Sequence, residues 1–177
     1  MKKARGWKQA TKKKPLKPRP PPVEVLTLAQ RESQAEEAEA KAAIHIREAL
    51  ATSSWGGAPN ACIHSAYYAM HFIAAAALLH AGGVGKRKDV PDSHEHVIQH
   101  YAKLVQTLPP PFKESGKLLN RARDMRIEAD YFRDEDGNLE FGVHGATAAE
   151  ASELTALASS FMANWLRCWG RLANESC

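Results

Sequence analysis

The sequence predicts an all-α protein, an up-and-down bundle of four to five helices that follows a disordered basic N-terminal arm. Three observations support this fold class. Five segments have helical periodicity or helix-forming composition, most of them open at a capping signal, and almost no segment shows a strand pattern. The connections between the segments are short, which favours antiparallel neighbours. We therefore assign residues 1–23 to the arm and residues 24–177 to one helical bundle.

The composition agrees with a single folded domain. The chain has 177 residues, of which 44% are hydrophobic, enough for one sizeable core. Its most apolar stretch, residues 72–79, is too short to span a bilayer, and the basic N-terminus lacks the apolar region of a secretion signal. The three widely spaced cysteines form neither a C-x-x-C pair nor a disulfide framework, so we expect a cytoplasmic protein.

The N-terminal arm carries the positive charge of the chain. Residues 1–23 contain nine lysines and arginines, several prolines and no acidic residue, a composition typical of disorder. The whole chain is +4, so without the +9 of the arm the remaining residues carry −5. The arm is either a solubilising tail or a segment that binds nucleic acid or a partner, and only the arm gives a charge argument for such binding.

The first two helices are predicted from a capping box and from proline and glycine. The first opens at Thr27, three residues before Gln30, and ends before the loop over residues 53–60. Its apolar face is mostly alanine, which suits packing against something large, such as a second subunit. The second helix starts near Pro59 and stops at the glycine pair 82–83. Its apolar stripe consists of Ile63, Tyr67, Met70, Ala74 and Ala77.

The last three helices are bounded by similar signals. The third opens at residues 92–95 and ends before three prolines, the fourth runs from about residue 112 to 133, and DEDGN follows as a turn. The fifth opens at Thr147, three residues before Glu150, and continues to near residue 172. The stripe of the fourth helix is Leu118, Ala122, Met125, Ala129 and Phe132, and that of the fifth is Leu154, Leu157, Phe161, Trp165, Cys168 and Leu172. We expect the second and fourth helices to pack together.

The end of the fourth helix, RDMRIEADYFRDEDG, is the first candidate site. Arg126 and Asp130 are four residues apart on one helix face, which by itself is the spacing of a surface ion pair. Arg121 and Arg123 precede them, and Tyr131 adds a hydroxyl where the helix ends. Such an arginine cluster is suited to holding a phosphate. The candidate catalytic residues are Arg126, Asp130 and Tyr131, and the candidate substrate-binding residues here are Arg123 and Glu128.

The second candidate site is IHSAYYAMHF on the second helix. His64, Tyr68 and His71 are spaced by four and three residues, so they line one flank of the apolar stripe. Three polar aromatic side chains there form a pocket wall, a polar network across an interface, or partly buried rings with satisfied polar tips. We include all three among the candidate substrate-binding residues.

No metal ion or cofactor is expected. His96 and His100 have a spacing that can hold zinc, but the sequence contains no H-E-x-x-H motif and places no third ligand. His64 and His71 lie two turns apart, too far to chelate one ion readily. The sequence has neither a glycine-rich phosphate loop on a strand nor a G-x-S-x-G motif, which excludes Rossmann and P-loop enzymes.

Four short motifs occur in order along the bundle: SAYYAM with a following ALL, a Ser-His helix start, RIEADY, and TAAEA at the start of the last helix. In this order they resemble the HEPN superfamily, and most closely its UPF0332 branch, over roughly residues 35–166. The resemblance implies a helical bundle that dimerises. It also implies a setting among metal-independent RNases of toxin–antitoxin and defence systems, some of which pair with a small nucleotidyltransferase.

The resemblance implies that Arg126 is the catalytic arginine, but the histidine that should follow it is missing. The HEPN catalytic signature is an arginine followed, after four to six residues, by a histidine, but the matching positions here are Tyr131, Phe132 and Arg133. Tyrosine, with an ordinary pKa of about 10, is a poor general base at neutral pH. The UPF0332 branch carries this R-x-x-A-D-Y form, so the missing histidine supports membership of that branch and counts against a nuclease function.

Three functions stay open. In the first, the protein is an RNase effector in which Arg126 stabilises charge on the scissile phosphate. The missing base then comes from a second subunit or from one of three histidines, His71, His94 or His144. In the second, Arg126 is the anion contact of a non-catalytic module that binds RNA, a nucleotide or a protein, and in the third the bundle is a structural dimer. The acidic bundle counts against strong sequence-independent RNA binding. We expect a homodimer of the toxin–antitoxin or defence type that binds RNA or a nucleotide.

Overall fold

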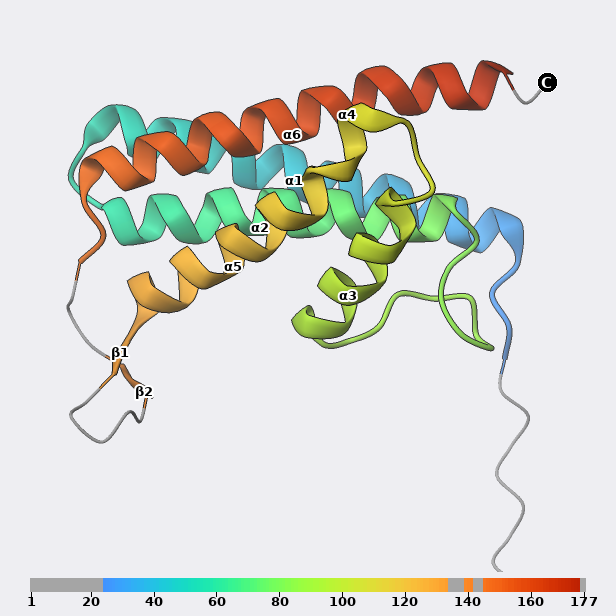
Figure 1. Ribbon diagram of the computed structural model, residues 1–177, viewed down its shortest axis with the longest axis horizontal. Coiled ribbons are helices and arrows are strands. Elements are labelled where there is room, and N and C mark those ends of the chain that lie inside the picture. Colours follow the sequence, from blue (N-terminus) through green and yellow to red (C-terminus); the bar gives the residue numbers. More distant parts are fainter. Residues whose placement is uncertain (1–23, 134–138, 142–144, 176–177) are drawn as a thin grey trace, which may run out of the picture.

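The computed structural model describes residues 24–133, 139–141 and 145–175 (Figure 1). The predicted basic arm, the turn sequence DEDGN and His144 lie outside the described residues.

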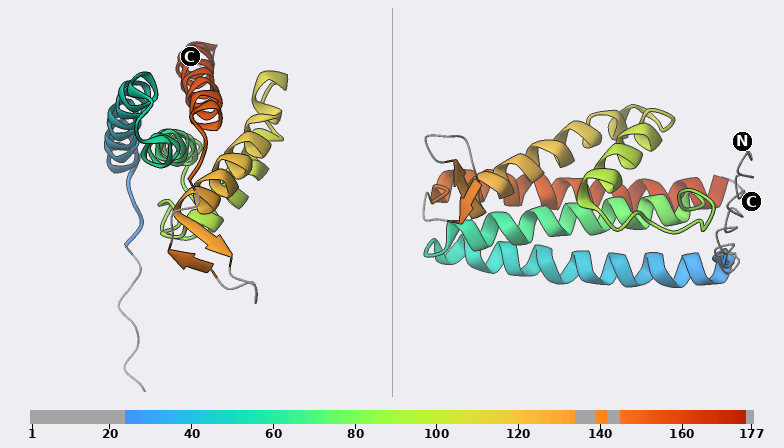
Figure 2. Two further views of the ribbon diagram at one scale, coloured as in Figure 1. Left: turned by 90° about the vertical axis from the view of Figure 1, so that its left-hand side faces the viewer. Right: turned by 90° about the horizontal axis from the view of Figure 1, so that it is seen from below.

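The described chain is an α-helical bundle with a small hairpin beside it. The helices are α1 (Leu28–Trp55), α2 (Pro59–His80), α3 (His94–Val105), α4 (Pro110–Lys113), α5 (Ser115–Asp130) and α6 (Ala148–Glu175), and the strands are β1 (Tyr131–Arg133) and β2 (Leu139–Phe141). Figure 2 shows α1, α2 and α6 running along the long axis, with α5 lying obliquely across them. Helix α2 packs against α1, α3, α5 and α6. The predicted fold class is confirmed, and so is the packing of the second helix on the fourth.

The capping signals read from the sequence are the ones the helices use. The Thr27 hydroxyl accepts a hydrogen bond from the backbone N–H of Gln30, whose side chain accepts one from the backbone N–H of Thr27. Thr147 and Glu150 form the same reciprocal pair before α6, and Ser93 caps α3. These side chains satisfy backbone donors that a helix start otherwise leaves unpaired.

Two boundaries differ from the sequence prediction. Helix α1 continues to Trp55, beyond the predicted end before residue 53, and stops where Gly56 takes a left-handed conformation with φ of 69°. The predicted fourth helix is two helices, α4 and α5, and it ends at Asp130 rather than at residue 133. Tyr131 is extended instead and pairs with Phe141 across the antiparallel hairpin. A three-residue strand is too short for alternation to reveal it.

Helix α2 forms the centre of the core. All five residues of its predicted stripe are at most 1% exposed. Helix α6 adds Leu154, Phe161 and Trp165, whereas Leu157 is only partly buried and the burial of Cys168 and Leu172 is not described. From α5 come Ala122 and Ala129, with Leu118 and Met125 packed against the core at its edge. The burial of Phe132 is not described.

The apolar length of α2 corrects one expectation. Among the described residues, this 22-residue helix is long and apolar enough to cross a membrane by length and composition. However, 67% of its most apolar window is buried inside the bundle, as in the core helix of a globular protein. The prediction that no run reaches this length therefore overlooked the residues that flank 72–79.

Asn60 joins three segments at one end of the bundle. Its Nδ2 donates a hydrogen bond of 2.8 Å to the carbonyl oxygen of Ala129, at the end of α5. Its Oδ1 accepts a hydrogen bond of 2.8 Å from the backbone N–H of Ala146, just before α6. The first turn of α2 thus holds together the two points where the hairpin segment leaves and rejoins the bundle.

Candidate functional site

The candidate site lies where the end of α5 meets the first half of α2 and the start of α3. We call it the Arg126 site, and it comprises His64, Tyr67, Tyr68, His71, His94, Arg126 and Asp130. Packing of α2 against both α3 and α5 brings these three elements together. Two of the sequence-predicted groups, one from α2 and one from α5, therefore form a single site.

Arg126 and Asp130 form an ion pair that is more buried than a surface pair. The Arg126 Nε lies 2.7 Å from the Asp130 Oδ2, and the side chains are only 22% and 16% exposed. The buried Nε nevertheless lacks a well-aligned hydrogen bond, so the contact is chiefly electrostatic. The terminal nitrogens of Arg126 make no hydrogen bond to any residue that the structure describes. They are therefore available to donate to an anion.

His64 contacts the same carboxylate oxygen of Asp130 from α2. Its Nδ1 lies 3.3 Å from the Asp130 Oδ2, and its side chain is 42% exposed. A carboxylate only accepts hydrogen bonds, so Nδ1 is the protonated nitrogen of a neutral His64. The Nε2 of His64 makes no hydrogen bond within the described part of the chain, which leaves its lone pair open.

A stack of polar aromatic rings extends from His64 into the bundle. The centroids of His64 and Tyr68 are 4.7 Å apart, and Tyr68 meets His94 edge to face at 5.4 Å. His71 and His94 stack at 4.4 Å with an interplanar angle of 14°. The Tyr67 hydroxyl is hydrogen-bonded to the Nδ1 of His94 at 2.7 Å. Helix α2 thus presents rings on two levels, partly exposed near Asp130 and buried near His94.

Burial determines the protonation of His71, His94 and Tyr67, the rings of the site that lie deepest in the bundle. Desolvation, followed by the nearby His94, lowers the pKa of His71 to about 4. Burial, then Arg126 and His64, lowers the pKa of His94 as well. Burial raises the pKa of Tyr67 to about 12. At neutral pH both histidines are therefore uncharged, Tyr67 is protonated, and Arg126 supplies the positive charge.

Tyr131, the third candidate catalytic residue, lies beside the site. Its ring centroid is 5.8 Å from the guanidinium carbon of Arg126, a cation–π distance. Tyr131 is partly buried at the first position of β1, where the chain has already left the helix. The contact between Tyr131 and Arg126 is therefore made by the aromatic ring of Tyr131.

The three arginines of α5 do not converge on one point. Arg121 pairs with Glu153 of α6 at 2.8 Å, and Arg123 pairs with the adjacent Asp124 at 3.0 Å. Arg126 alone reaches Asp130. The predicted arginine cluster is therefore reduced to one guanidinium at the site, with Arg123 close enough to act electrostatically on Tyr67.

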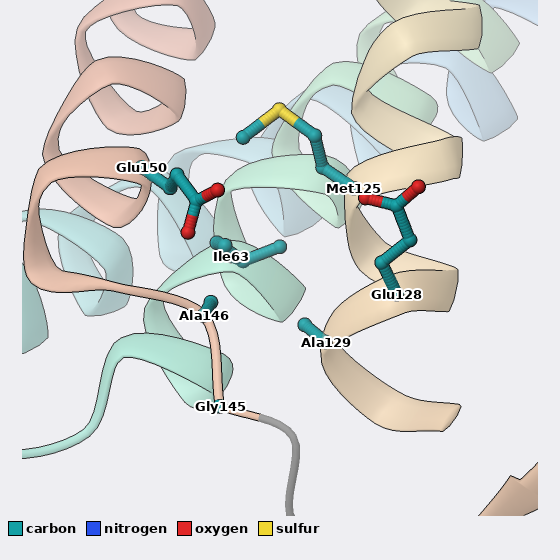
Figure 3. Close-up of a pocket in the computed structure, with 7 residues that line it drawn as sticks. All are labelled: Ile63, Met125, Glu128, Ala129, Gly145, Ala146 and Glu150. Atoms are coloured by element: carbon teal, nitrogen blue, oxygen red, sulfur yellow. The ribbon is translucent and has the colours of Figure 1, made fainter. Parts of the chain in front are cut away.

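Glu128 lies elsewhere, in a small pocket between α2, α5 and the start of α6 (Figure 3). The pocket has a volume of about 170 Å³ and is lined by Ile63, Met125, Glu128, Ala129, Gly145, Ala146 and Glu150. The carboxylate of Glu150 there accepts hydrogen bonds from Thr147. Neither Arg126 nor His64 lines this pocket, so Glu128 does not join the Arg126 site.

Sequence reasoning missed two features of the site. It placed Tyr67 in the apolar stripe, where it is indeed fully buried, but did not anticipate its hydroxyl contact with His94. It also missed the contact of His64 with Asp130, because the two residues are 66 positions apart. As for metals, the described residues contain no group of three or more His, Cys, Asp or Glu side chains arranged to hold an ion.

Fold and site together define a helical bundle with a partly buried Arg126–Asp130 ion pair beside a cluster of aromatic rings. The family model of the HEPN domain matches residues 40–169, well over half of the chain. The chain therefore belongs to the HEPN domain family, which is associated with toxin–antitoxin and defence RNases. No curated protein and no solved structure matched it.

Proposed function

We propose that this HEPN-domain protein binds the phosphate of RNA or of a nucleotide at Arg126 and acts on RNA as an effector of a toxin–antitoxin or defence system. The observation that carries the proposal is that the Arg126 guanidinium is held in place at one nitrogen and, within the described chain, unpaired at the other two. Asp130 fixes its Nε at 2.7 Å in a largely buried setting, while its terminal nitrogens have no hydrogen-bond partner among the described residues. Such a preorganised guanidinium is suited to a phosphate. The family association supports the biological setting.

The rings next to Arg126 favour a nucleic acid over an inorganic anion. Tyr68 and His64 are partly exposed and stack at 4.7 Å, which offers a surface for an unpaired base. The bundle without the arm carries a formal charge of −5, so we expect few phosphate contacts and a shallow salt dependence for the site itself. Single-stranded RNA fits this combination better than a duplex.

We further propose the UPF0332 branch, a homodimer and a small nucleotidyltransferase partner for this protein. The R-x-x-A-D-Y form of the sequence from Arg126 to Tyr131 supports the branch. The partner and the dimer follow from that resemblance. Co-purification from the native host tests the partner.

Replacement of Arg126 tests the proposal. We expect Arg126→Ala to keep its fold and to weaken binding of a labelled single-stranded RNA by about 10- to 100-fold, since a charge-assisted contact contributes about 1.5–3 kcal/mol. Arg121→Ala is the matched control, because that arginine lies on the same helix and pairs with Glu153 away from the site. Fluorescence anisotropy measures binding, and AMP as competitor separates a nucleotide site from an RNA site. Equal affinity of Arg126→Ala and wild type would contradict the proposal.

A second candidate is a non-catalytic dimerisation or partner-binding module. The observation that favours it is the apolar exposure on α1, where Ile44, Leu50 and Trp55 are 48%, 50% and 76% exposed. In that case Arg126→Ala leaves RNA and AMP binding unchanged, and substitutions on α1 disturb assembly instead.

A further inference from the structure

The geometry points to His64, on α2, as the general base of RNA cleavage at this site. The inference rests on the proposed function and adds to it the residue that accepts the proton. The histidine of the HEPN catalytic signature has no counterpart at residues 131–133. His64 comes from a different helix and reaches the site through Asp130.

The tautomer of His64 fits this role. The Asp130 carboxylate accepts a hydrogen bond from the Nδ1 of His64, so the neutral ring has its lone pair on Nε2. That nitrogen is free of hydrogen bonds within the described residues, and the side chain is 42% exposed. When Nε2 takes a proton, the adjacent carboxylate stabilises the imidazolium that forms. The pair Asp130–His64 thus has the arrangement of an oriented base.

One carboxylate oxygen links the base to the anion site. The Asp130 Oδ2 lies 2.7 Å from the Arg126 Nε and 3.3 Å from the His64 Nδ1. Both side chains therefore stand beside the same oxygen, close enough to address one phosphodiester and its neighbouring 2′-hydroxyl. Arg126 holds the phosphate while His64 faces the ribose.

The other histidines of the site are less suited to the role. His71 is 9% exposed and its pKa is lowered to about 4, so it is a weak base that solvent and substrate hardly reach. The Nδ1 of His94 is hydrogen-bonded to the Tyr67 hydroxyl, and no carboxylate of the described residues contacts its ring. His144 lies outside the described residues.

The chemical step balances without a metal or a second reactant. The His64 Nε2 takes the proton of the ribose 2′-hydroxyl, and the 2′-oxygen forms a bond to phosphorus. The bond from phosphorus to the 5′-oxygen breaks, and that oxygen takes a proton from water. His64 then returns its proton to the solvent. The products are a 2′,3′-cyclic phosphate and a 5′-hydroxyl end, and Arg126 stabilises the charge on the non-bridging oxygens.

The test measures binding and cleavage separately on the full chain. The probes are an end-labelled single-stranded RNA of mixed sequence and its all-deoxy counterpart. We expect wild type to cleave the RNA and spare the DNA, and His64→Gln to lose at least about 100-fold in cleavage rate, as expected for a lost general base. RNA affinity of His64→Gln should fall by much less than its cleavage rate, because Arg126 and Tyr68 remain at the site. The matched control is His96→Gln, since His96 is an exposed histidine of α3 outside the site.

A further readout separates chemistry from structure. Added imidazole should restore part of the activity of His64→Ala, because it replaces the missing base, and it should not restore Arg126→Ala.

The outcomes distinguish this inference from the proposed function. If wild type binds the RNA through Arg126 but leaves it intact, the inference is overturned and the binding function stands. Cleavage by His64→Gln at the wild-type rate also overturns it. If wild type neither binds nor cleaves RNA, the proposed function fails and the inference fails with it.

Discussion

The two faces of α2 carry different kinds of side chain, apolar towards α1 and polar aromatic towards α3 and α5. Towards α1 the helix is packed with small apolar side chains, of which Ala35, Ala38, Ala76 and Leu79 form one buried cluster. Towards α3 and α5 the same helix presents His64, Tyr67, Tyr68 and His71. One face buries apolar side chains between the two helices, and the other holds polar rings with partly satisfied hydrogen bonds.

The difference separates the side chains of α2 that stabilise the fold from those that are candidates for function. The face of α2 towards α1, which we call the alanine face, is an ordinary apolar core of Ala35, Ala38, Ala76 and Leu79. The opposite face, with His64, Tyr67, Tyr68 and His71, is the ring face. There the buried Nδ1 of His71 has no hydrogen-bond partner within the described chain, and an unpaired buried nitrogen lowers stability. A core selected for stability alone would place an aliphatic residue at position 71. Rings and charges that lower stability where three helices meet are typical of a functional site.

Acidification should have the largest effect, and it acts on the ring face. The pKa of His71 is lowered from 6.5 to about 4 in the folded chain. Between these values the unfolded chain binds a proton that the folded chain does not. Stability is therefore complete above pH 6.5 and falls as the pH drops towards 4, by about 3 kcal/mol. His94, whose pKa is also lowered, acts in the same direction. Urea unfolding across this pH range measures the loss.

His71→Leu is the control for the pH effect. It removes both the unpaired nitrogen and the titrating group, so most of the slope should disappear, while stability at neutral pH should change by less than about 1 kcal/mol. A variant that keeps the wild-type slope would mean that His71 is not the source of it.

Overpacking the alanine face should have the next largest effect. Ala35 is fully buried between α1 and α2, so Ala35→Leu should destabilise the fold by about 1–3 kcal/mol. Ala40→Leu, at an exposed position of the same helix, should change stability by less than about 0.5 kcal/mol. Chemical denaturation of both variants measures the contrast. Equal stabilities would show that the α1–α2 contact is loosely packed.

The outward side of α1 should matter least for the fold. Ile44 is 48% exposed, so Ile44→Ser should change the free energy of unfolding by less than about 0.5 kcal/mol. Sedimentation of the full chain at micromolar concentration tests the proposed dimer at the same time. A species of only 19.5 kDa would contradict the dimer, and a large loss of stability in Ile44→Ser would show that this face is packed.

The elements of the fold could be predicted because their signals are local. Thr27 with Gln30 and Thr147 with Glu150 lie three residues apart, and the stripe of α2 repeats every three to four residues. The hairpin was not predicted, because β1 and β2 are three residues each and are stabilised by pairing with one another. The break between α4 and α5 at Glu114 has no side-chain cap that a sequence pattern could reveal.

The site could be predicted only in parts. Spacing along a helix identified Arg126 with Asp130, and His64 with Tyr68 and His71. Their meeting depends on the packing of α5 on α2, which no local pattern contains. The same limit explains Glu128, which lies two positions from Arg126 and so faces another side of the helix, towards the pocket of Figure 3.

The two hydrogen bonds of Asn60 have an evolutionary consequence. They tie Ala129 to Ala146, so the bundle is closed at the points where the hairpin segment begins and ends. A segment anchored in this way can change in length or sequence at small entropic cost, because its ends stay fixed by contacts outside it. We therefore expect the length of the chain between residues 132 and 145 to vary among related proteins more readily than Asn60, which holds the two ends of that segment.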